Sequence, residues 1–463
     1  MRTGTAPTRR APMPTTATPH GPALHGSLTP PPPPGCCESA LPTIENHPGR
    51  AHRNRTPARA APPRSLRRFP PPALPAHPHL GGTHGSEPAH ETVPPLFHPR
   101  RHHTLRPRRP GPDRRPHRRT VPLRPTTAQG ASPAAELAPQ GQTSLRAADP
   151  SVLRVGSTYI GVQSTGGGIA VRQASSTDGL ATAPARQVWS DTRDRGEVWA
   201  PEIVMDGGRY YIYFTAGRGA AHRMFVISSA TPDSGYGAET QLALPDGKWA
   251  IDGTLFTFEG QRWFVWSGWA GDTNVEQNLY IARMSSPTQP TGARYVISQP
   301  RESWERVVGN PFINESPEAI KDPNGQLHIV YSANGSWSDQ YCLADLRLRK
   351  GGDPTYVWDW YKSNGCLFGS NRSTMMAGWD PTLYVNGPGH HTFVLLHGDI
   401  NTSPPAGPKF PSMFHAVPKG TPYSWANRHW YTGTFAWWGN TTYSRANVPG
   451  PNTDTGWSLK FFE

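Results

Sequence analysis

The chain has 463 residues, and its composition changes so sharply near residue 140 that we expect one folded unit, not the two or three that this length allows. The formal net charge of +13 belongs to the first part, because residues 1–140 carry 20 arginines and six acidic residues, whereas the remainder has 26 basic and 27 acidic residues. A folded part near neutrality gives no electrostatic reason to expect specific nucleic-acid binding, and there is no run of 18 apolar residues that could form a membrane span.

Residues 1–140 are rich in proline and arginine and contain no Lys, Tyr or Trp. A segment of this composition cannot bury enough apolar surface to offset its ordering entropy, so we expect it to be disordered. Two other interpretations stay open: non-specific binding of polyanions by the arginines, and a translation start set too far upstream. No basic segment followed by an apolar run is present, so no secretory signal can be read in this N-terminus.

From residue 149 onward, a short strand with a polar residue, a turn containing Gly or Asn, and a strongly apolar strand follow one another repeatedly. This pattern is typical of β-hairpins. The first strands of five such units are Asp149–Val155, Ala200–Met205, Ile251–Phe258, Glu315–Ile320 and Gly387–Leu396, and their partners begin near Ser157, Arg209, Gln261, Gln326 and Lys409.

Five units of similar length without an amphipathic helix predict an all-β fold, a five-bladed β-propeller over residues 141–463. A β-sandwich with irregular strand spacing is the alternative. It gives no reason for an acidic residue to recur at the start of four successive first strands, at Asp149, Glu202, Asp252 and Glu315. In a propeller the innermost strands surround a central channel, so these four acids could converge there.

Converging carboxyl groups suit the hydrolysis of glycosidic bonds. This reaction needs one protonated carboxyl group to assist the leaving oxygen and one carboxylate to activate water or attack the sugar. A third carboxylate nearby raises the proton affinity of the acid, because like charges repel. We therefore consider Asp149, Asp252 and Glu315 as the catalytic group.

Five short motifs in the same order resemble those of glycoside hydrolase family 43, especially its exo-acting α-L-arabinofuranosidases. They are Ala148-Asp-Pro-Ser-Val152, Trp199-Ala-Pro-Glu-Ile203, Ala250-Ile-Asp-Gly-Thr254, Asn314-Glu-Ser-Pro-Glu318 and Gly387-Pro-Gly-His390. The resemblance implies that Asp149 is the general base, Glu315 the general acid and Asp252 the residue that modulates the pKa of the acid and orients it. It also implies that His390 lies in the channel, where it could ligate a cation directly or through water.

Several residues keep a second interpretation. Glu318 competes with Glu315 for the acid role, and their odd separation in one strand predicts side chains on opposite faces. Asp252 before glycine could belong to a turn, and His390 or His391 could be a buried structural histidine. Candidate substrate-binding residues are Trp199, Glu202, Trp269, His222 and Arg223, although most tryptophans should fill the space between blades.

The resemblance implies inverting release of terminal α-L-arabinofuranosyl residues from arabinan or arabinoxylan, with plant polysaccharide or arabino-oligosaccharide as the partner. Alternatives are a β-xylosidase or an endo-arabinanase of the same family, or a non-catalytic carbohydrate-binding propeller. We expect a secreted monomer that needs no cofactor, with calcium or sodium in the channel as an option. Cys342 and Cys366 could form a disulfide or stay free, and neither their number nor their spacing suggests a zinc site.

Overall fold

The computed structural model describes residues 141–394, 409–446 and 452–463. The predicted disordered segment 1–140 lies outside the described residues. Within them, twenty β-strands and six short 3-10 helices are present. None of the described helices has the length and hydropathy that a membrane span requires.

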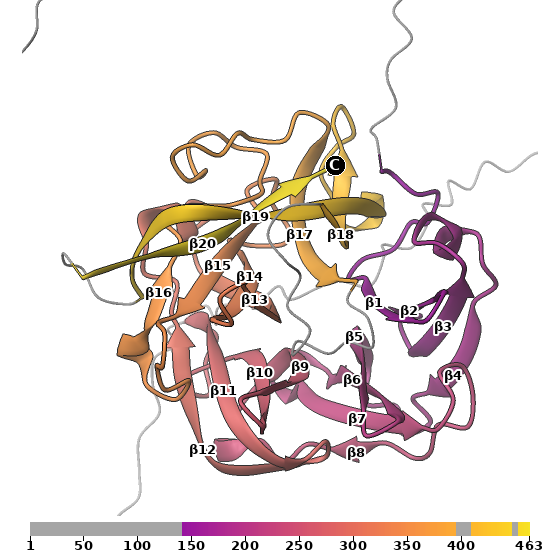
Figure 1. The fold of residues 1–463 in the computed structure, drawn as a ribbon. Helices are drawn as coiled ribbons and strands as arrows, with labels where there is room; N and C mark the ends of the chain where they lie inside the picture. The colour runs from indigo at the N-terminus through magenta and orange to yellow at the C-terminus, as the bar shows by residue number, and fades with distance from the viewer. Residues whose placement is uncertain (1–140, 395–408, 447–451) are drawn as a thin grey trace, which may run out of the picture. The chain divides into compact units, whose positions relative to one another are not determined.

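The strands form five antiparallel blades around a central channel (Figure 1), which confirms the predicted propeller. The first blade consists of β1 (Ser151–Val155), β2 (Thr158–Ser164), β3 (Gly168–Ala174) and β4 (Arg186–Ser190), and the second of β5 (Glu197–Asp206), β6 (Arg209–Gly217), β7 (Arg223–Ser229) and β8 (Thr240–Gln241). The third contains β9 (Ala250–Phe258), β10 (Gln261–Gly268), β11 (Glu276–Ser286) and β12 (Gln289–Ser298), and the fourth β13 (Phe312–Lys321), β14 (Leu327–Ala333), β15 (Cys342–Leu348) and β16 (Trp360–Lys362). The fifth has β17 (Val385–Phe393), β18 (Phe410–Pro418), β19 (His429–Arg445) and β20 (Thr453–Phe462).

Neighbouring blades are joined by a few backbone contacts beyond their own ladders. A short parallel pairing links β11 to β13, and an antiparallel one links β16 to β19. The segment before the first blade bonds to the last one, since the Thr143 amide donates to the Trp430 carbonyl at 3.0 Å and the Trp430 amide donates to Leu145 at 3.1 Å. The first and fifth blades are thereby connected.

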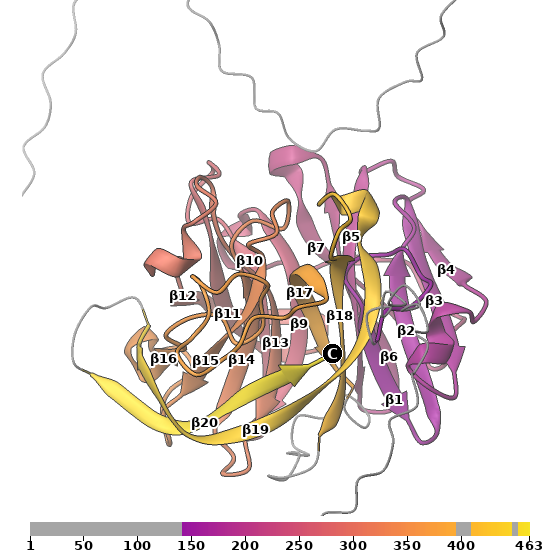
Figure 2. The same cartoon turned by 90° about the horizontal axis from the view of Figure 1, so that it is seen from above.

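The spaces between blades are filled mainly by aromatic and β-branched side chains, as the sequence predicted. The largest fully buried side chains include Trp266, Trp360 and Trp430. The inner strands β1, β5, β9, β13 and β17 contact one another around the ring, which Figure 2 shows turned by 90°. Contacts between Asp149 just before β1, Asp252 in β9, Ser316 in β13 and His390 in β17 bring these parts of the strands together.

The six 3-10 helices lie in connections between or beside these strands. They are η1 (Asp178–Ala181), η2 (Gly219–Ala221), η3 (Pro245–Gly247), η4 (Ser303–Glu305), η5 (Val357–Asp359) and η6 (Trp425–Asn427). Cys342 and Cys366 form a disulfide that joins the start of β15 to the connection between β16 and β17. The structure thus resolves the pairing that the sequence left open.

Candidate active site

Each blade has one non-glycine residue in the left-handed conformation within its inner strand or, in the first blade, just before it. These residues are Asp149, Ala200, Asp252, Ser316 and His390, with φ of 50°, 43°, 54°, 54° and 43°. Such a conformation costs about 1 kcal/mol or more for each residue, and residues of this kind concentrate at functional sites. The strained positions mark one end of the channel as the candidate site.

A β-bulge accompanies the left-handed residue and changes which side chains face the channel. In the fourth blade Glu315 pairs with Ser332, whereas Glu318 pairs with Val330, so β13 has one more residue than β14 over this stretch. The extra residue restores the same facing for Glu315 and Glu318. The predicted placement of these two acids on opposite faces is therefore wrong: both point toward the channel, at different depths.

Asp149 lies among basic side chains. Its Oδ1 atom is 3.2 Å from His390 Nδ1 and 3.1 Å from His415 Nδ1, and the Arg428 guanidinium is 3.4 Å from the other nitrogen of His415. Burial alone would raise the pKa of Asp149, but His390, then the hydrogen bond and charge of His415, and then Arg428 hold this pKa well below its usual value. Asp149 is thus an ionised carboxylate over the whole physiological range.

Asp252 and Glu315 behave in the opposite way. Both are buried, and burial is the main cause that raises the pKa of each to about 7. The negative charge of Asp149 raises both values further, and the charge of Glu315 adds to the shift of Asp252, while His390 opposes these effects. Electrostatic coupling is mutual, so Asp252 and Glu315 hold a proton between them near neutral pH.

His390 connects the carboxyl groups. Its Nδ1 atom is 2.8 Å from the Ser316 hydroxyl, which donates to Asp252 at 3.0 Å, and its Nε2 atom is 3.0 Å from Glu202 Oε1. The structure thus places His390 among these carboxyl groups, and both of its ring nitrogens are engaged by protein groups. In the described part of the chain no three His, Cys, Asp or Glu side chains are arranged to hold a metal ion. A channel cation reached through water stays a prediction.

Glu202 lies one layer deeper, where it meets Glu318. Burial raises the pKa of Glu202 to about 8, against hydrogen bonds from Ser151 and Glu318, and burial together with the charge of Glu202 raises the pKa of Glu318 as well. Two neighbouring buried carboxyl groups share a proton, and His390 beside Glu202 offsets their repulsion only in part. Glu202 thus supports His390 from below, and a contact with substrate stays a prediction.

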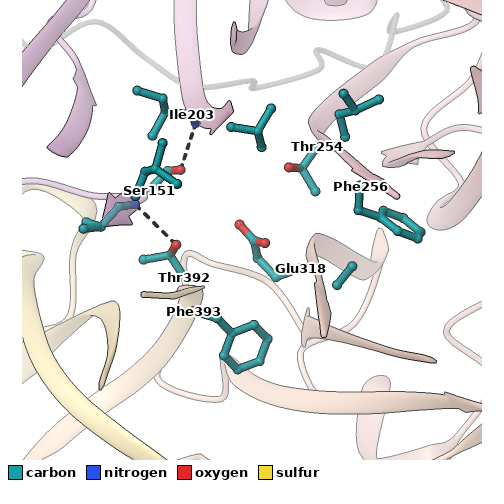
Figure 3. A pocket seen from close by; sticks show the side chains of 12 residues that line it. Ser151, Ile203, Thr254, Phe256, Glu318, Thr392 and Phe393 are labelled. Carbon is teal, nitrogen blue, oxygen red and sulfur yellow. Dashed lines mark hydrogen bonds between the residues drawn. The ribbon is translucent and has the colours of Figure 1, made fainter. Parts of the chain in front are cut away.

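A cavity of about 30 Å³ lies below the carboxyl groups. Figure 3 shows Glu318 pointing into it together with Ser151, Thr254 and Thr392, which occupy the second position after the left-handed residue in their blades. This volume holds one or two water molecules but no sugar. The cavity is the deeper part of the channel, and the candidate site lies above it.

The predicted aromatic candidates gather beside Asp252 at the open end of the channel. The rings of Trp199 and His222 stack at 4.1 Å, and Trp269 stacks on Trp249 at 4.7 Å, with Ile251 packed against this group. The sequence did not single out Trp249. These rings face one another, so they form a rigid wall next to Asp252.

Arg223 differs from the other candidates. Its guanidinium donates to the carbonyl oxygens of Ala220 and His222, at 3.0 and 2.8 Å, within its own loop. These bonds stabilise the loop that carries His222. Contact of Arg223 with substrate stays a prediction.

Four residues of the site were not predicted: Ser316, Tyr341, His415 and Arg428. Tyr341 packs on His415 with ring centroids 5.7 Å apart, and its hydroxyl lies 3.3 Å from Ser316 and bonds to Glu315. His415 and Arg428 follow the last motif in the chain, so no motif marked them. The signal that could have found His415 is a basic residue in the apolar strand β18, where it is fully buried.

Comparisons with known proteins relate this chain to glycoside hydrolases. The family model described as "Glycosyl hydrolases family 43" matches residues 143–402. An extracellular exo-α-(1→5)-L-arabinofuranosidase of Streptomyces avermitilis is 32% identical over 236 residues, which are 49% of this chain and 46% of the relative. An α-L-arabinofuranosidase 43 of Humicola insolens is 30% identical over 242 residues, 50% of this chain and 48% of the relative, so this chain spans about half the length of these relatives.

The fold has close counterparts among solved structures. The crystal structure of an α-L-arabinofuranosidase from Lactobacillus brevis superposes with a TM-score of 0.55 at 25% sequence identity. The superposition covers 66% of this chain and 95% of that one. The matched part of this chain therefore corresponds in fold to almost the whole of that structure.

Proposed function

This chain belongs to glycosyl hydrolase family 43, and from that premise we propose that it is an inverting exo-α-L-arabinofuranosidase. It releases terminal α-L-arabinofuranosyl residues from arabinan or arabinoxylan outside the cell. The similar proteins that cover half of the chain carry arabinofuranosidase names, and two are described as extracellular. A relative described as an arabinan endo-1,5-α-L-arabinosidase matches only 30% of this chain, less than the arabinofuranosidases do. This difference favours exo-acting over endo-acting hydrolysis.

One observation carries the proposal: carboxyl groups with opposite proton affinities meet at one end of the channel. The pKa of Asp149 is held below its usual value, and that of Glu315 is raised to about 7. Two acids whose environments separate their pKa values are the requirement of acid–base hydrolysis. Asp149 takes a proton from water, and Glu315 gives one to the leaving oxygen.

The remaining residues hold this pair in its working state. His390, His415 and Arg428 stabilise the negative charge of Asp149, so it stays an acceptor when the surroundings are acidic. Asp252 is tied to His390 through Ser316, and its coupling to Glu315 favours the protonated acid. In a single displacement, water attacks from the side opposite to the leaving oxygen, which inverts the anomeric centre.

The full chain should release 4-nitrophenol from 4-nitrophenyl α-L-arabinofuranoside and arabinose from debranched arabinan, and act weakly on the β-D-xyloside. The first sugar formed should be the β-anomer, measured by proton NMR within the first turnovers. A first-formed α-anomer would exclude inversion. Preference for the xyloside would make the enzyme a β-xylosidase, and cleavage of none of the three substrates would contradict the enzyme proposal.

The acid is tested by leaving-group dependence. Glu315→Ala should lower kcat on α-1,5-arabinobiose by a factor of about 10² to 10⁴ and lower it far less on the 4-nitrophenyl glycoside, because a good leaving group needs no proton. Glu318→Ala serves as the matched control from the same strand. Equal losses on both substrates for Glu315→Ala would assign the acid role to another residue.

A further inference from the structure

Two exposed tryptophans occupy loops at the same end of the ring as the candidate site. Trp337 is 44% exposed in the connection from β14 to β15, and Trp425 is 37% exposed in the connection from β18 to β19. The first loop follows Ala333, which pairs with Asn314 beside Glu315. The second follows Pro418, which pairs with Val385 at the start of the strand that carries His390. Both loops therefore border the mouth of the channel.

The two loops are tied to each other. The Trp425 indole and the Tyr423 hydroxyl both donate to the Ser336 carbonyl, at 2.9 and 3.0 Å. The Trp337 ring folds over Gly335, where a Cβ atom would lie only 2.4 Å from the ring. The Trp425 indole is thus held by the first loop and the Trp337 ring packs on the backbone of Gly335, although a large part of each residue faces solvent.

The tied loops lie next to the proposed acid and base. Tyr341 ends the first loop and bonds to Glu315 and Ser316, while Arg428 ends the second and contacts His415, the partner of Asp149. The wall of Trp199 and Trp269 instead flanks Asp252. The exposed indoles and the buried aromatic wall therefore occupy different parts of the rim.

We propose that Trp337 and Trp425 form a binding platform for the leaving-group side of the substrate, the first arabinofuranose unit beyond the cleaved bond. This inference rests on the proposed function. Glu315 must reach the leaving oxygen, so the leaving sugar has to lie beside Glu315, where these loops are. Furanose rings present C–H groups that pack on aromatic faces, and an exposed indole fixed by its neighbours binds them without paying further ordering entropy.

Two other exposed tryptophans show what the proposal excludes. Trp358 belongs to η5, in the connection from β15 to β16 at the opposite end of the fourth blade, and Trp438 lies in β19 with Lys460 3.9 Å from its ring centre. Neither lies on a loop that contacts the acids. Trp358→Ala is therefore a matched control with the same loss of exposed indole.

The test compares a substrate that reaches the platform with one that does not. For Trp337→Ala and Trp425→Ala of the full chain, KM for α-1,5-arabinotriose should rise about tenfold, with kcat within twofold of wild type. KM and kcat for methyl α-L-arabinofuranoside should stay unchanged, because a methyl group is too small to reach the indoles. Trp358→Ala should match wild type on both substrates.

Each outcome decides a different claim. Unchanged kinetics of both variants on arabinotriose would overturn the platform and leave the proposed function intact. Equal losses on arabinotriose and the methyl glycoside would also overturn it, because they would indicate disturbance of the catalytic pocket. If wild type cleaves neither substrate, the proposed function fails, and the platform fails with it.

Discussion

Carboxyl groups occur at two depths of the same channel, and their surroundings differ. At the mouth, Asp149 is 24% exposed at its side chain and faces two imidazoles, while Asp252 and Glu315 share a proton beside it. One layer deeper, Glu202 and Glu318 meet each other, and Glu318 lines a small cavity. The same residue type on the same strands thus serves acid–base chemistry at one depth and support of His390 at the other.

The largest difference between the two depths should appear on removal of one carboxylate from each. Asp149→Asn should lower kcat on every arabinofuranoside by about 10³-fold, because Asp149 is the carboxylate whose pKa its neighbours hold low and the amide cannot accept a proton. Glu318→Gln should retain kcat within a few fold, since the amide replaces a carboxyl group that shares a proton with Glu202. Steady-state kinetics of both variants measures this contrast, and comparable losses would remove the distinction between the layers.

A smaller effect should follow when the environment of the base is changed. His415→Ala removes the hydrogen bond from His415 that helps to lower the pKa of Asp149, so this pKa should rise. Since the base works as a carboxylate, the acidic limb of the kcat/KM profile should move to higher pH, and kcat should fall about tenfold. His415→Asn keeps a polar atom near the position of Nδ1. It should therefore restore part of kcat and move the acidic limb part of the way back. An acidic limb that does not move would show that His415 only fills space.

A change beside the acid Glu315 should move the alkaline limb of the kcat/KM profile. Glu315 works in its protonated form, and the charge of Asp252 favours that form, so activity is lost as pH rises through about 7. Asp252→Asn removes the charge and should move the alkaline limb of kcat/KM down by about one pH unit. The exposed Asp272→Asn is the control and should leave the limb in place. A shift of the acidic limb instead would link Asp252 to the base.

Local sequence signals predicted much of this architecture. The inner strands and the convergence of Asp149, Asp252, Glu315 and His390 were expected, and Trp199, His222 and Trp269 were named one by one as candidates. The structure shows in addition that these three rings lie in one aromatic group. These features depend on strand alternation and on short motifs, both of which can be read within a few residues.

What the sequence could not show depends on bulges and on contacts between distant blades. Strict alternation placed Glu318 away from Glu315, but the left-handed Ser316 inserts an extra residue and reverses the facing. His415 contacts Asp149 although the two are 266 residues apart in the chain. Arg428 contacts His415, and both come close to Asp149 only because the circle of blades places the fifth blade beside the first. Such contacts follow from the arrangement of whole blades, which no local pattern encodes.

The deeper layer gives the smallest predicted effect, on stability and not on rate. Glu318 has a raised pKa in the folded protein, so the fold holds its proton more tightly than the unfolded chain does. Its contribution to stability is complete below the pKa of an ordinary glutamic acid and is lost as pH rises through the raised value. The melting temperature should therefore fall between pH 5 and pH 9. Glu318→Gln should reduce that fall by a few degrees, because the amide does not titrate.

Glu202 still titrates in this variant, with its pKa raised to about 8, so the fall should become shallower without disappearing. The exposed Glu259→Gln changes the net charge equally and should leave the slope as in wild type. Calorimetry at several pH values for wild type and both variants measures the three slopes. A Glu318→Gln slope equal to that of wild type would mean that the deeper carboxyl group titrates normally. The two layers would then differ in position but not in proton affinity.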